Sequence, residues 1–73
     1  MNAVSTPEQR AARQRARDQL HRARAVKARH DIDAMRHALL GHDERMAFHL
    51  GRSQRCQEDI DRLEADLHRG SAR

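Results

Sequence analysis

The most constraining feature of the chain is a long segment of helix-forming residues with a clear start and a clear stop. Positions 7–40 contain no glycine and no second proline, and they are rich in Ala, Arg, Gln and Leu, which favour helices. Thr6 can cap the start, with Pro7 at the first helical position and Gln9 completing a capping box. Gly41 offers a left-handed residue of the kind that ends helices. The pattern predicts one long helix over about 7–40.

A second helix is predicted after a turn over 41–43. The turn closes on an aspartate that fits the N-cap position, and the helix should run over about 44–69 and stop at Gly70. Gly51 interrupts this run and Ser53 can cap a restart, so the pattern leaves open a bend or split near Gly51–Ser53. No alternating pattern predicts a strand. The chain is therefore expected to be all-α.

Apolar spacing predicts how the two helices face each other. Both contain a stripe with the 3,4 spacing of a coiled-coil seam. In the first helix the stripe is Ala25, Ala28, Ile32, Met35 and Leu39. In the second it is Met46, His49, Ser53, Cys56, Ile60, Leu63 and Leu67. The first helix carries another stripe, roughly 120° away around the axis, which consists of Ala12, Ala16, Leu20 and Ala23. Either this helix bends, or its two halves face different neighbours.

The charge pattern agrees with an antiparallel hairpin. Residues 1–30 carry eight basic and two acidic side chains, for a net charge of +6. Residues 31–73 carry seven basic and nine acidic side chains, for a net charge of −2. A hairpin that folds at the turn sets the basic part beside the acidic part, with Arg24 near Asp61 and Lys27 near Glu58. Such pairs favour antiparallel over parallel packing, although each contributes little stability.

The hydrophobic content is low for a domain that stands alone. Only 37% of the 73 residues are hydrophobic, and twelve of those 27 are alanines. A core of this size rarely supplies more than about 3–5 kcal/mol. We therefore expect residues 6–70 to form a helical hairpin that either dimerises into a four-helix bundle or docks on a partner. Residues 1–5 and 71–73 are expected to be disordered.

A surplus of hydrophobic residues near the turn predicts the site of function. Half of residues 35–50 are hydrophobic, which is more than one seam requires, and a surplus of this kind commonly marks an interface. The predicted contact residues are Val26, Leu40, Met46, Phe48 and Leu50. They favour a small regulatory protein, an adaptor or inhibitor that associates with a protein partner or with a second copy of itself.

The arginines of the first helix support an alternative hypothesis, nucleic-acid binding. Arginine outnumbers lysine 14 to 1, and the guanidinium group suits phosphate recognition. The candidate residues are Arg10, Arg13, Arg17, Arg22, Arg24 and Arg29. No aromatic residues interleave with them for base stacking. The competing interpretation is that this charge faces the acidic second helix.

Six histidines suggest a third hypothesis, a metal-responsive assembly. His30 and His37, like His42 and His49, are seven residues apart, which is too far to chelate one ion on a helix. We therefore predict no metal site and no cofactor. Cys56 is expected to be an inert seam thiol, so an enzyme is not expected. The sequence carries neither a secretory signal nor an apolar run of membrane-spanning length, and we expect a cytoplasmic protein with no membrane partner.

Overall fold

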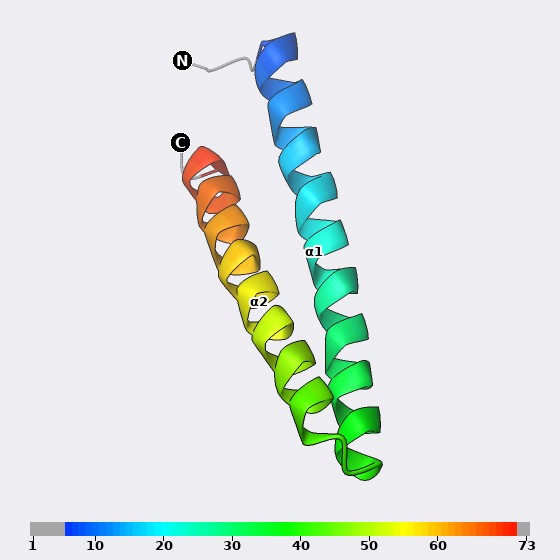
Figure 1. Cartoon of the computed structure of the whole chain (residues 1–73). Helices are drawn as coiled ribbons and strands as arrows, with labels where there is room; N and C mark the ends of the chain where they lie inside the picture. Colours follow the sequence, from blue (N-terminus) through cyan, green and yellow to red (C-terminus); the bar gives the residue numbers. More distant parts are fainter. Residues whose placement is uncertain (1–5, 72–73) are drawn as a thin grey trace.

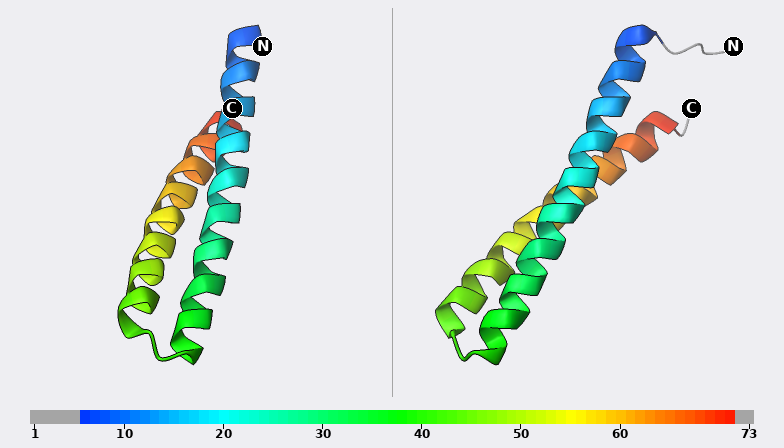
Figure 2. Two further views of the ribbon diagram at one scale, coloured as in Figure 1. Left: turned by 45° about the vertical axis from the view of Figure 1, so that its right-hand side comes forward. Right: turned by 90° about the vertical axis from the view of Figure 1, so that its right-hand side faces the viewer.

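The computed structural model describes residues 6–71, which form two α-helices and one tight turn. Helix α1 spans Pro7–Leu39 and helix α2 spans Asp43–Ser71. They lie side by side in opposite directions (Figure 1) and cross at a shallow angle (Figure 2). The hairpin measures 59 × 16 × 12 Å, and the first turns of α1 extend past the end of α2. The predicted all-α antiparallel hairpin is confirmed. Disorder was expected for residues 1–5 and 71–73; of these, Ser71 is the last residue of α2, and the others lie outside the described residues.

The predicted signals begin and end α1. The Thr6 hydroxyl accepts a hydrogen bond from the backbone N–H of Gln9 (3.1 Å), and the Gln9 side chain accepts one from the Thr6 N–H (2.9 Å). At the other end Gly41 has a φ of 74°. The His42 N–H donates to the His37 carbonyl and the Gly41 N–H to the Ala38 carbonyl, which is the Schellman arrangement. The turn follows directly from this glycine.

Helix α2 is continuous where the sequence left a bend or split open. It starts at Asp43, one residue before the predicted start. Asp43 is therefore the first residue of the helix, and the N-cap position falls on the residue before it. It passes through Gly51 without a break and extends to Ser71, past the glycine at position 70. Nothing lies within 4 Å of the place where a Cβ would stand on Gly51. Ser53 packs in the seam instead of capping a restart.

The predicted seam of α2 is the one observed. Ile60 and Ser53 are buried, at 5% and 7% exposure. The remaining positions of the stripe are half-buried, namely Met46, His49, Cys56, Leu63 and Leu67. This face follows the 3,4 spacing over the whole helix, so α2 packs along α1 with one face only.

The sequence predicted the wrong face of α1 for the contact with α2 in the second half of this helix. The observed seam continues the other stripe, through Leu20 and Ala34, which are buried at 8% and 3% exposure. Its half-buried members are Ala16, Ala23, Lys27, His30 and His37. The residues predicted to be in the seam are exposed, with Ile32 at 56%, Met35 at 66% and Leu39 at 83%. A straight helix can present only one face to α2, and α1 presents the face that begins with its first stripe.

The rotation of α1 also changes the predicted charge pairs. The Arg24 guanidinium lies 2.5 Å from a Glu64 carboxylate oxygen, one turn beyond the predicted partner Asp61. Lys27 pairs with Asp31 of its own helix at 2.8 Å rather than with Glu58 of the other. The antiparallel direction was predicted correctly, while the individual partners were not, because the stripe chosen for α1 was wrong.

Candidate interaction surface and interhelical seam

The rotation of α1 leaves an apolar surface that no described residue of α2 covers. We call it the outer face and define it as Ala25, Ala28, Ile32, Met35 and Leu39, all of which are exposed. Residues two apart on a helix point about 200° apart around the axis. Ile32 therefore points away from α2, since His30 and Ala34 on either side of it point toward α2. The spacing of this outer face is that of a coiled-coil seam.

A row of basic side chains borders the outer face along one edge. Arg22, Arg29 and Arg36 are all exposed, and their seven-residue spacing places them on one line along the helix. We call this line the arginine edge. A shallow groove along α1 is lined by Arg29 and Arg36 from this edge, by half-buried Asp33, and by three residues of the outer face, Ala25, Ala28 and Ile32. The groove has an apolar floor and a charged rim, as interfaces do.

The contact residues predicted near the turn do not form one patch. Met46 is half-buried in the seam. Phe48 and Leu50 are exposed, but they are two residues apart on α2 and so point toward opposite flanks. Val26 and Leu40 are exposed on one face of α1, about 21 Å apart along the axis. The Phe48 ring lies under the Arg52 guanidinium at 5.1 Å and edge-on to His49.

Sequence reasoning missed the outer face because it assigned those residues to the seam. The signal was present in the two α1 stripes, which point in different directions. A straight helix leaves one of them outside, and the stripe left outside is the one with the larger side chains.

The arginines proposed for nucleic-acid contact differ in their surroundings. Arg13 is half-buried and Arg24 is held by Glu64. The other four candidates are exposed, namely Arg10, Arg17, Arg22 and Arg29. Two of these four, Arg22 and Arg29, belong to the arginine edge. The acidic helix therefore faces only a part of the basic charge of α1.

Four histidines meet at the turn end of the seam, and we call them the histidine ladder. His30 Nδ1 lies 2.9 Å from His49 Nδ1 across the helices, and His37 Nδ1 lies 3.1 Å from His42 Nδ1. The rings of His37 and His49 stack, with centroids 5.5 Å apart. Each short contact needs one protonated and one unprotonated nitrogen. The sequence paired these histidines along the chain, whereas the hairpin pairs them across it.

The surroundings of His37 favour its neutral form. Burial in the seam lowers the pKa of His37, and the charges of His42, His49 and Arg45 act in the same direction. Of these three residues His42 lies in the turn and the other two lie on α2; the carboxylate of Asp33 opposes them. A positive charge on the ladder therefore costs the folded hairpin free energy.

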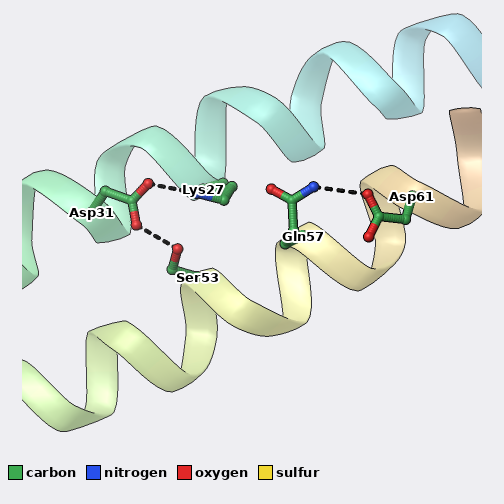
Figure 3. A network of polar contacts seen from close by, with 5 residues as sticks. All are labelled: Lys27, Asp31, Ser53, Gln57 and Asp61. Carbon is green, nitrogen blue, oxygen red and sulfur yellow. Dashed lines mark hydrogen bonds and ion pairs between the residues drawn. The ribbon is translucent and has the colours of Figure 1, made fainter.

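A second polar group lies in the middle of the seam (Figure 3). Lys27 donates to one oxygen of Asp31 at 2.8 Å, and the Ser53 hydroxyl donates to the other. These two hydrogen bonds lower the pKa of the Asp31 carboxyl. Partial burial opposes them, and the charges of Lys27 and His30 support them. On α2 Gln57 donates to Asp61 at 2.8 Å. Ser53 thus fixes the register of the helices at this point.

Within residues 6–71 no three His, Cys, Asp or Glu side chains are grouped so that they could hold a metal ion, and the metal-responsive assembly stays a prediction. Cys56 is a free, half-buried thiol. Neither described helix is long and apolar enough to cross a membrane.

Comparisons with protein families, with curated proteins and with solved structures found no match to this chain. The outer face, the arginine edge and the seam together describe a thin helical hairpin that leaves seven large apolar side chains exposed.

Proposed function

We propose that the protein is a small non-enzymatic adaptor or inhibitor that acts by associating with another protein chain through the outer face of α1. The observation that carries the proposal is the distribution of large apolar side chains. Leu20 and Ile60 are the large ones buried among the described residues. Seven others are exposed, namely Val26, Ile32, Met35, Leu39, Leu40, Phe48 and Leu50.

The energetics support a partner on this surface. Full burial of an aliphatic side chain contributes about 1.5–3 kcal/mol, so covering Ile32, Met35 and Leu39 adds as much as the hairpin's own small core. Val26 and Leu40 lie on the flank beyond the arginine edge, where a larger partner can reach them. We place this activity in the cytoplasm as part of the same proposal, since a chain with one cysteine forms no internal disulfide.

Photo-crosslinking tests the proposal. A photoreactive amino acid is placed at Met35 on the outer face, and in a matched control at Gln54, which is exposed on α2. Both variants are expressed in the cells that make the protein, after circular dichroism has shown that both fold. We expect a discrete protein adduct from position 35 and none from position 54. Equal labelling from both positions, or no protein adduct from either, contradicts the proposal.

Nucleic-acid binding is the second candidate function. It is favoured by Arg17, Arg22 and Arg29, which are exposed and stand outside the ion pairs found among the described residues. A mobility-shift assay with duplex DNA and with RNA at low salt tests it. Binding should weaken steeply with added salt as counterions are released. Absence of a complex at low salt rejects this candidate.

A further inference from the structure

We propose that the outer face of α1 binds an amphipathic helix of another protein, one that carries acidic residues along the edge of its apolar stripe. This inference rests on the proposed function and names its partner. The surface fits a helix because its apolar residues repeat with 3,4 spacing from Ala25 to Leu39, a length of about 21 Å or four turns. The alanines at one end let a partner backbone approach closely, and the larger side chains at the other end supply the apolar contact.

The arginine edge specifies the charge of that partner. Arg22, Arg29 and Arg36 stand where the flanking residues of a second helix would meet α1. Asp33 is the acidic side chain that lines the same groove, so the edge keeps a net charge of +2. Carboxylates suit guanidinium groups best, because the planar fork accepts them with two parallel hydrogen bonds.

The opposite edge of the outer face is already occupied. Arg24 pairs with Glu64 of α2. Asp31 accepts hydrogen bonds from Lys27 and Ser53. The side chains of this edge therefore take part in holding the hairpin together, and the arginine edge is left as the charged border that recognises a partner.

A second copy of this chain fits the surface poorly. In an antiparallel pair around a twofold axis, each surface meets its own copy, so arginine edge would face arginine edge. The acidic half of α2 does not provide a suitable helix either. Among the described residues its large apolar side chains, Ile60, Leu63 and Leu67, already lie in the seam. The charge pattern therefore favours a different protein.

Binding of two designed peptides tests the inference. Both are amphipathic helices with leucines at 3,4 spacing, and they differ only in the flanking residues, which are glutamates in one and lysines in the other. Fluorescence anisotropy with the full chain measures both affinities. We expect the glutamate peptide to bind about tenfold tighter at low salt, as several partly exposed ion pairs would give. The preference should shrink in 0.5 M salt because the charges are screened.

Charge reversal supplies the matched control. Arg29→Glu with Arg36→Glu should invert the preference, so that the lysine peptide binds tighter. Arg17→Glu with Arg55→Glu changes the net charge equally at exposed positions away from the groove, and it should leave the preference intact. Circular dichroism checks that both variants keep their helix content.

Three outcomes overturn the inference, and they can be told apart. Equal binding of both peptides that is lost with Ile32→Ser and Leu39→Ser leaves the proposed function standing but removes the acidic partner. If neither peptide binds and the adducts from position 35 contain only a second copy of the chain, the partner is a second copy. Failure of both peptides, with duplex DNA bound and released by the Arg29 and Arg36 reversals, replaces the protein partner with nucleic acid.

Discussion

The two isoleucines of the chain provide a sharp test of which face of α1 packs on α2. Ile60 is 5% exposed in the seam, and Ile32 is 56% exposed on the outer face. The same substitution, isoleucine to alanine, removes the same atoms in both cases. The difference between the two effects therefore reports burial rather than chemistry.

The expected magnitudes follow from these exposures. Truncating a buried isoleucine to alanine costs about 2–5 kcal/mol in a packed core, and the open seam of a hairpin places Ile60→Ala near about 2 kcal/mol. Ile32→Ala removes less buried area and replaces a β-branched residue by the best helix former. Its net effect should stay within about 0.5 kcal/mol of zero. The gap of about 1.5 kcal/mol is more than a tenfold difference in the unfolding equilibrium.

Urea unfolding followed by circular dichroism measures both free energies of unfolding. The experiment is run at several protein concentrations, so that any contribution from association is visible as a shift in the midpoint. An Ile32→Ala variant that loses as much stability as Ile60→Ala, at all concentrations, would place Ile32 in the seam and refute the rotation of α1 on which the outer face depends.

Three further predictions concern the seam and the glycines. Stability should fall as the pH drops below about 6.5, because the pKa of His37 is lowered in the hairpin and the unfolded chain then binds more protons. A urea midpoint that is higher at pH 5.5 than at pH 7.5 would contradict the histidine ladder. So would a loss of stability in acid that is equally large in His37→Gln. Asp31→Ala should lower the melting temperature, since it leaves the Ser53 hydroxyl and Lys27 without their acceptor. An unchanged melting temperature would show that this network does not fix the register. Gly51→Ala should stabilise α2 by about 0.5–1 kcal/mol, whereas Gly41→Ala should destabilise the turn because φ is positive there. Melting temperatures that shift in the same direction for both variants would contradict these backbone assignments.

Local signals predicted the architecture well, because they act over a few residues. Thr6, Pro7 and Gln9 specify a helix start through hydrogen bonds within one turn, and Gly41 specifies a stop through its backbone freedom. The seam of α2 was equally readable because one stripe dominates that helix. These features depend little on what the rest of the chain does.

The face of α1 was not predictable in the same way, because two stripes compete. The stripe with Ile32 and Leu39 is the more apolar, yet the stripe with Leu20 and Ala34 is the one that meets α2. The packing of the two helices is needed to see that polar residues of the observed seam contact one another. His30 and His49, for example, meet across the helices. Sequence analysis did not identify the outer face for the same reason, since it assigned those residues to the seam, while the contact residues predicted near the turn stay a prediction.

Isoleucine methyl NMR on the unmodified chain shows in one experiment whether the outer face of α1 is a docking surface outside the seam. When only isoleucine methyl groups are isotope-labelled, the two isoleucines of the chain, Ile32 and Ile60, each give one set of signals. A soluble paramagnetic probe should broaden the Ile32 signal strongly and spare Ile60. Adding the glutamate peptide should then protect and shift Ile32 while Ile60 stays in place. Equal protection of both signals without peptide would place Ile32 in the seam, and an Ile32 signal that the peptide leaves unchanged would show that the outer face does not bind it.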